Sequence, residues 1–321
     1  MSRFFCLLIG AVFGLAAVAV DADSYPVRPI RMIVPYVAGG SYDTIARIIA
    51  QPMGENLHQQ IVIDNRPGAS GIIGTELVAG ATPDGYTIAM FGDNQTLTAA
   101  VRRKLPYNML KDFTPITRVA RVDYVVVVSP SMPARSLTEL IALLKANPGK
   151  YYYGSGGASG TSHFASALLT LKADVNVVHV PYKGGGLAVI GLVANEVQMM
   201  VLNMISAAPH IKTGRLRGLA IAAKERSPLL PDVPTTAEAG LAGFEWSQWY
   251  GIFAPTGVSR AVLAKLYGEI ARVMSLPEVK SKVESQGARP MLETPQDLTV
   301  FVKQNIEDNR KIAKDANIRA E

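Results

Sequence analysis

The sequence predicts an α/β protein made of two doubly wound units. Three observations carry this prediction. Short apolar runs alternate with amphipathic segments through residues 29–91, and the same alternation returns between residues 124 and 223. Glycine-rich turns follow several of the apolar runs, as they do where a strand passes into a helix. The chain has 321 residues, of which 49% are hydrophobic, so it can bury a sizeable core in each unit.

The first unit begins with a short apolar strand over residues 29–35. A helix over 41–53 follows, because Ile45, Ile49 and Met53 fall on one helical face. The remaining elements, in order, are a strand over 60–64, a turn over 67–71, a helix over 72–81, a turn over 83–85 and a strand over 86–91. Strands joined through helices in this way are expected to be parallel.

The second unit repeats the pattern. Strands are predicted over 124–129, 151–153, 177–180, 197–202 and 216–223, and helices over 137–146, over 162–171 and after the turn at 181–186. A proline-rich connector at 228–234 leads to a strand over 246–255, which we expect to leave the unit. The tail has apolar helical faces over 262–274 and 298–312. The two units share an architecture but no sequence repeat.

Residues 1–22 have the features of a secretory signal peptide. Arg3 supplies positive charge, residues 4–20 are apolar or small, and small residues suited to cleavage lie between Ala19 and Ala22. The alternative is a membrane anchor, but the run is short for a span of about 20 residues and an acidic flank follows it. We therefore expect cleavage and a periplasmic mature protein. Cys6 is the sole cysteine, which excludes an internal disulfide or a cysteine-based metal cluster.

The charge balance favours anionic ligands without indicating nucleic acid. Lys and Arg number 32 against 26 Asp and Glu, which gives a net charge of +6. The excess is spread along the chain and forms no basic run, so we expect no nucleic-acid partner.

Glycine-rich loops follow the predicted strands in both units, and a ligand is expected there. In open α/β sheets, ligands bind outside the carboxyl ends of the strands. A helix start offers free N–H groups and a partial positive charge, and glycine lets an anion approach the backbone closely. The loops span residues 39–43, 68–71, 92–94, 154–161 and 183–186. Each also has a purely structural interpretation, since Gly and Ser commonly turn the chain and cap helices.

Motifs for catalysis, nucleotides or metals are missing. No phosphate-binding or dinucleotide-binding glycine motif follows the first strand, and Tyr153 stands where a serine-hydrolase elbow at Ser155 needs glycine. The four histidines lack metal-ligand spacing and are expected to be structural, with His163 the best placed for a ligand. Asp43 lies in a first helical turn, where helix stabilisation explains it as well as ligand contact. We expect no catalytic residue, cofactor or metal site.

Several motifs together resemble the Bug/TctC family, the extracytoplasmic solute receptors of tripartite tricarboxylate transporters. The resemblance runs through the mature chain in one order, over residues 29–35, 39–47, 62–71, 83–87, 160–163, 180–184, 231–240 and 249–255.

The resemblance implies a type 2 periplasmic-binding-protein fold, in which two doubly wound α/β lobes close on a ligand cleft. It implies a first lobe of residues 23–122 and 245–321 and a second lobe of residues 123–244. Family members bind small carboxylates through the first strand–helix loop and a facing loop of the second lobe. Carried onto this sequence, the implied ligand-binding residues are Gly39, Gly40, Ser41, Tyr42, Asp43, Asn65, Asp93, Ser155, Gly156, Ser159, Gly160, Thr161, Ser162 and Lys183.

Three positions depart from the family pattern. Tyr42 stands where the family usually has a small polar residue, so it either narrows the site or stacks on a ring-bearing ligand. Gln198 and Leu202 stand where many relatives have Asp, which is expected to change which ligand groups are accepted, amino groups included.

The function expected from the resemblance is capture of a small organic acid and its delivery to membrane subunits of a tripartite tricarboxylate-type transporter. The protein would act as a monomer, without catalysis or cofactor. One alternative is a receptor that presents its ligand to a sensor kinase. The other is an exported serine hydrolase that uses Ser155 or Ser159.

Overall fold

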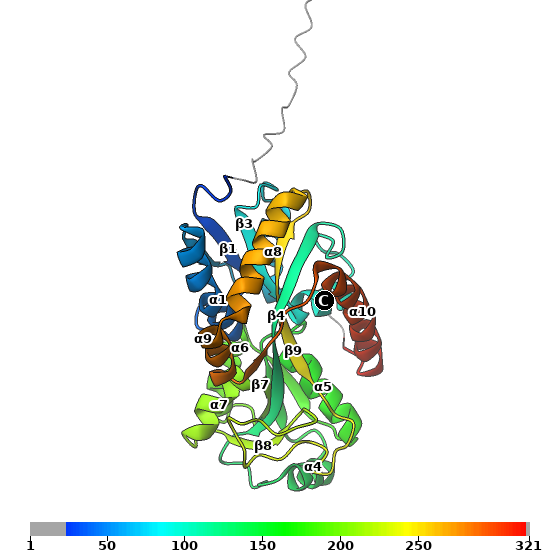
Figure 1. Cartoon of the computed structure of the whole chain (residues 1–321). Coiled ribbons are helices and arrows are strands. Elements are labelled where there is room, and N and C mark those ends of the chain that lie inside the picture. The colour runs from blue at the N-terminus through cyan, green and yellow to red at the C-terminus, as the bar shows by residue number, and fades with distance from the viewer. Residues whose placement is uncertain (1–23, 319–321) are drawn as a thin grey trace, which may run out of the picture.

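A computed structural model describes residues 24–318, so the predicted signal peptide and Cys6 lie outside the described residues. The strands of this range form a ten-stranded mixed sheet whose two halves are each flanked by helices (Figure 1). We call the half that contains β1 (Ile30–Val34) the first lobe and the half that contains β7 (Met199–Asn203) the second lobe.

The first lobe has the strand order β2-β1-β3-β9-β4. The strands β2 (Ile61–Asn65), β1 and β3 (Thr87–Gly92) are parallel. The strand β9 (Ser247–Pro255) runs antiparallel to β3 and to β4 (Phe113–Val128), and the short β10 (Ala288–Pro290) pairs with β4.

Helices cover both faces of this sheet because successive strand residues point to opposite sides. Met32 packs in one cluster with Ile45 of α1, and the adjacent Ile33 packs in another with Leu298 of α10. The helices of the first lobe are α1 (Ser41–Leu57), α2 (Ile72–Ala79), α3 (Asp93–Val101), α8 (Arg260–Ser275), α9 (Pro277–Ser285) and α10 (Pro295–Asp315). A short 3₁₀ turn, η1 (Ala69–Gly71), precedes α2.

The second lobe is built on the later half of β4. There β4 pairs antiparallel with β7 and with β8 (Arg217–Ile221), and β5 (Tyr152–Ser155) runs parallel to β7 and to β6 (Val178–Pro181). Val126 packs in one cluster with Leu140 of α4, and Val125 packs in another with Leu202. The helices of this lobe are α4 (Leu137–Ala146), α5 (Thr161–Ala173), α6 (Gly185–Val193) and α7 (Met204–Lys212).

The strands β4 and β9 join the lobes. In Figure 1 both run from the upper half of the molecule into the lower half. Asp123 of β4 still pairs with Ser247 of β9, whereas the next residue, Tyr124, pairs with Asn203 of β7. The carboxyl ends of β1 and β5 therefore meet where the sheet changes partners, and the loops that follow them face each other.

The α/β architecture predicted from the sequence is confirmed, with three corrections. The sheet is mixed, not parallel, because β4 and β9 extend through the boundary and pair antiparallel with their neighbours. The strand predicted over 124–129 begins at Phe113, since it serves both lobes. Where a loop was expected at residues 92–94, the helix α3 begins at Asp93. None of the helices in residues 24–318 is both long and apolar enough to cross a membrane.

Candidate functional site

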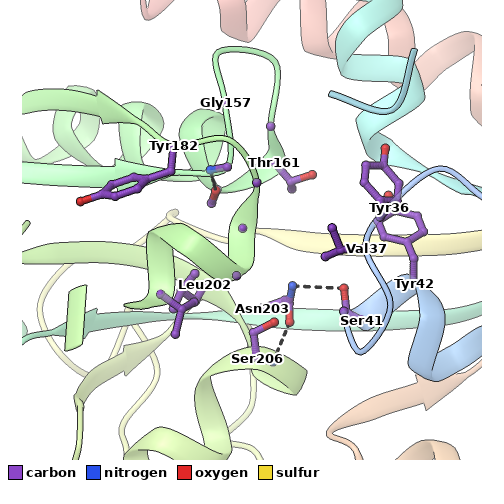
Figure 2. Close-up of a pocket in the computed structure, with 18 of the residues that line it drawn as sticks. Tyr36, Val37, Ser41, Tyr42, Gly157, Thr161, Tyr182, Leu202, Asn203 and Ser206 are labelled. Atoms are coloured by element: carbon purple, nitrogen blue, oxygen red, sulfur yellow. Dashed lines mark hydrogen bonds between the residues drawn. The ribbon is translucent and has the colours of Figure 1, made fainter. Parts of the chain in front are cut away.

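A cleft of about 1010 Å³ lies between the lobes. Loops after β1 and β2 line it from the first lobe, together with Asn94 of α3. Loops after β5 and β6 line it from the second lobe, together with parts of α6 and α7. This volume lies at the upper end of the range for small-molecule sites, so a small ligand would share the cleft with water. Figure 2 shows ten of the lining residues by name.

Four helices begin at the cleft on a glycine. The N-cap residues of α1, α2, α5 and α6 are Gly40, Gly71, Gly160 and Gly184, and glycine has no side chain that could accept a hydrogen bond from the helix start. All four glycines line the cleft. Three helices that begin elsewhere have a capping side chain, namely Ser136 at α4, Ser259 at α8 and Thr294 at α10, whereas α3 and α9 begin on Gly92 and Leu276 without one. Free N–H groups and helix dipoles thus converge on the cleft, and they favour an anion there.

One of these helix starts is capped from the opposite lobe. Asn94 Oδ1 accepts hydrogen bonds from the backbone N–H of Thr161 at 2.9 Å and from its hydroxyl at 2.6 Å. Thr161 is the first residue of α5 in the second lobe, and Asn94 belongs to α3 in the first. A second contact between lobes joins Asn203 Nδ2 to Ser41 Oγ at 3.5 Å (Figure 2). The lobes therefore touch across the site through polar side chains.

The formal charges at the cleft are positive. Among the described residues, no Asp or Glu lines it, whereas Lys183 and Arg215 do, and neither cation forms an ion pair within residues 24–318. His210 also lines the cleft, and burial together with the nearby Arg215 lowers the pKa of its imidazole. The site can therefore stabilise a carboxylate through charge-assisted hydrogen bonds, and it offers no acidic partner to an ammonium group.

A match to a known family identifies the family to which the chain belongs. Residues 45–318 match the model of TctC, the tripartite tricarboxylate transporter family receptor. The chain belongs to this family. TctC proteins are periplasmic solute-binding receptors and not enzymes.

Three solved structures are similar over nearly the whole described chain. A protein described as a periplasmic transporter is 37% identical, with 92% of this chain and 99% of its own covered and a TM-score of 0.87. An R. palustris protein solved with adipate is 32% identical, with the same coverage and a TM-score of 0.89. MatC of Rhodopseudomonas palustris, solved with bound malate, is 31% identical, with coverage of 90% and 99% and a TM-score of 0.82.

Nine of the residues implied by the resemblance to TctC proteins line the cleft. They are Gly39, Gly40, Ser41, Tyr42, Gly156, Gly160, Thr161, Ser162 and Lys183. The other five, Asp43, Asn65, Asp93, Ser155 and Ser159, do not line it. The structure places these five behind the cleft wall.

Asp43 and Asn65 brace the first loop of this TctC-family chain. Asp43 Oδ2 accepts hydrogen bonds from the Gly39 N–H at 2.9 Å and from Arg47 Nε at 2.8 Å. Burial raises the pKa of Asp43, but these hydrogen bonds outweigh it and hold the pKa below its usual value. Asn65 donates to the carbonyl of Tyr36 at 3.1 Å. Both side chains fix the loop from beneath and leave its upper surface to the cleft.

Asp93 is buried at the boundary between the lobes. Its Oδ1 accepts the Trp249 N–H of β9 at 3.2 Å, and its Oδ2 has no hydrogen-bond partner. Burial raises the pKa of this carboxyl to about 7. The side chain is turned toward β9, and its neighbour Asn94 reaches the cleft instead.

A stacked histidine pair supports the loop after β5. Ser155 Oγ lies 2.7 Å from His179 Nε2 and also hydrogen bonds with the backbone of Gly157. The rings of His179 and His163 stack with centroids 3.8 Å apart, and Tyr153 OH lies 3.1 Å from His163 Nδ1. Burial lowers the pKa of His163 to about 3 and that of His179 to about 4. Ser155 is fully buried, so it positions Gly157 and is closed to a substrate.

The three departures from the TctC pattern have different outcomes. Tyr42 is 3% exposed, and its ring packs on Tyr36 at 4.3 Å and against Tyr250 at 4.9 Å, so only its edge reaches the cleft and it is not free to stack on a ligand. Gln198 lies outside the cleft, where its side chain bonds the backbone of β5 and of residue 195. Leu202 lines the cleft.

Sequence reasoning did not name several lining residues as ligand contacts, although it placed Asn94 in a loop where a ligand was expected. Asn94, Asn203 and Ser206 line the cleft, and Asn203 Oδ1 caps α7 by accepting the Ser206 N–H at 2.9 Å. A signal was present at Asn203, because Asn after an apolar strand is a common helix N-cap. The role of Asn94 had no local signal, since its partner is 67 residues away.

Proposed function

We propose that this chain is an extracytoplasmic receptor that captures a small organic acid in the interlobe cleft and delivers it to a tripartite tricarboxylate-type membrane transporter. The observation that carries the proposal is the convergence of four glycine-capped helix starts on a cleft where, within residues 24–318, the cations have no ion pair and no carboxylate lines the wall. The relatives solved with adipate and with malate support a carboxylate as the ligand.

Binding would begin on one lobe and end with both in contact. We infer that a ligand carboxylate accepts hydrogen bonds at Ser41, the first residue of α1, and at Ser162 of the opposite loop, because the N–H groups of Gly39, Gly40 and Thr161 already have partners. Closure would then shift an existing equilibrium between open and closed forms. We place the lobe boundaries after residues 122 and 244, and the change of partners along β4 supports this placement.

Export and assembly complete the proposal. We infer that residues 1–22 direct the chain to the periplasm and are cleaved there, which the family's periplasmic location supports. The mature receptor would act as a monomer, because one chain supplies both walls of the cleft.

The test uses the substitution Gly40→Val. Gly40 has a φ of −77°, which any residue can adopt, and an added Cβ would lie 3.3 Å from the carbonyl oxygen of Val37, so a side chain there requires that carbonyl to move by a few tenths of an ångström. The valine would cover the start of α1, and we expect at least a tenfold loss of affinity. The matched control is Gly268→Val, on an exposed face of α8 where an added Cβ meets nothing within 4 Å.

The ligand is first sought by native mass spectrometry of the purified protein and by thermal shift against mono-, di- and tricarboxylates and aromatic acids. Affinities are then measured by calorimetry. Unchanged affinity in a folded Gly40→Val protein would refute the site, and failure of every carboxylate to bind would refute the function.

A further inference from the structure

We propose that the cleft selects acids with an unsubstituted apolar body over hydroxy and amino acids of the same length, and that Leu202 is the residue that sets this choice. The inference rests on the proposed function and names the class of acid. Alkyl or aryl carboxylates and dicarboxylates belong to the favoured class, whereas 2-hydroxy and 2-amino acids do not.

The wall of the cleft beside the anion loops is apolar. Leu202 is the penultimate residue of β7, is 4% exposed and lines the cleft beside Asn203 (Figure 2). Val189 and Val193 of α6 and Ile205 of α7 line the same cleft and pack in the same cluster as Leu202. A methylene or aromatic body that extends from the helix starts would meet hydrocarbon on this side, which buries apolar surface on both partners.

The polar side chains nearest this wall already bond one another. Asn203 Oδ1 accepts the Ser206 N–H, and Asn203 Nδ2 donates to Gln248 Oε1 at 3.3 Å as well as contacting Ser41. Gln248 Oε1 also accepts the Tyr124 hydroxyl at 3.0 Å. A ligand hydroxyl turned toward Leu202 would lie against hydrocarbon, and one turned toward Asn203 or Gln248 would displace a bond already formed there; both cost binding free energy.

An ammonium group would find no anion. The two nearest candidate acids from the sequence, Asp43 and Asp93, do not line the cleft. The Asp43 carboxylate accepts hydrogen bonds from Arg47 and from the Gly39 N–H. The Asp93 carboxyl group accepts a hydrogen bond from the backbone of β9. Leu202 presents hydrocarbon to the cleft, so no carboxylate stands at that point to neutralise an ammonium.

The experiment compares acids that differ in one substituent. Glutarate, 2-hydroxyglutarate and glutamate form one series, and adipate and 2-aminoadipate form another, each titrated into the mature protein by calorimetry at pH 7.5. We expect the unsubstituted acid to bind about tenfold tighter or more in each series. The variant Leu202→Asn is expected to reduce this ratio, and Leu202→Asp to invert it for the amino acids, whereas Leu202→Met should preserve it.

The outcomes separate this inference from the proposed function. Equal or tighter binding of the hydroxy or amino acid by the wild-type protein would overturn the inference and leave the receptor function intact. A wild-type preference that Leu202→Asn retains in full would overturn the assignment to Leu202. The wild-type ranking needs no variant, so the inference can be refuted even if Leu202→Asp fails to fold. Absence of binding by all five acids and by the wider panel would refute both proposals.

Discussion

Replacing Asn94 with alanine should shift the equilibrium between the closed and open forms toward the open form. Its Oδ1 accepts two hydrogen bonds from Thr161, at 2.9 and 2.6 Å, and both join one lobe to the other. In an open form these groups would bond water instead, so each bond favours the closed form by only its net value of about 0.5–1.5 kcal/mol. Asn94→Ala should therefore shift the equilibrium toward the open form by about 1–3 kcal/mol, which is roughly 5- to 150-fold.

Two measurements and one matched variant test this reasoning. Small-angle scattering of the ligand-free protein should show a larger radius of gyration for Asn94→Ala, and ligand affinity should fall, because apparent affinity scales with the population that can close. Asn94→Asp keeps the acceptor oxygen and adds a negative charge, so it should remain as compact as wild type while binding anions more weakly. A compact Asn94→Ala protein with wild-type affinity would refute the role of this contact.

Other predictions concern stability. Burial lowers the pKa of His163 and His179 and raises that of Asp93, so between pH 6.5 and 5 unfolding takes up protons at the histidines and releases one at Asp93. The free energy of unfolding, measured by urea denaturation, should therefore fall on acidification. Asp93→Asn removes the released proton and should steepen this fall by about 1.4 kcal/mol per pH unit. Identical slopes against pH for the variant and the wild type would contradict the raised pKa of Asp93. An added Cβ at Gly74 would lie 2.7 and 2.8 Å from backbone atoms of two neighbouring segments. Gly74→Ala should destabilise the first lobe by about 1–3 kcal/mol, whereas exposed Gly268→Ala should not, and equal melting temperatures would refute the packing argument.

Local patterns predicted most of the strand and helix order. Alternating and amphipathic runs, such as Ile45, Ile49 and Met53, depend only on neighbours in the sequence, and the buried faces follow from them. The glycine loops were found in the same way. Gly40 and Gly160 start helices, and a helix start exposes N–H groups whatever surrounds it.

What escaped prediction depends on distant partners. The first half of β4 contains Pro115, Arg118 and Arg121, which weaken a strand pattern, and its pairing with β9 offsets them. The buried residues of α3 are mostly polar, Gln95, Thr96 and Thr98 among them, so its sequence lacks the apolar face that predicts a helix. The family resemblance implied Asp93 as a ligand-binding residue, yet its carboxyl group accepts the N–H of Trp249, 156 residues later.

The pairing of β3 with β9 has a consequence for biosynthesis. Ala89 lies opposite Phe253, so the inner edge of the first lobe stays uncovered until the last quarter of the chain has been made. The second lobe lies between these strands in sequence and can assemble earlier, whereas an emerging first lobe would present an open strand edge able to pair with other chains. A chain ended before β9 should therefore aggregate through β3, while its second lobe retains native secondary structure.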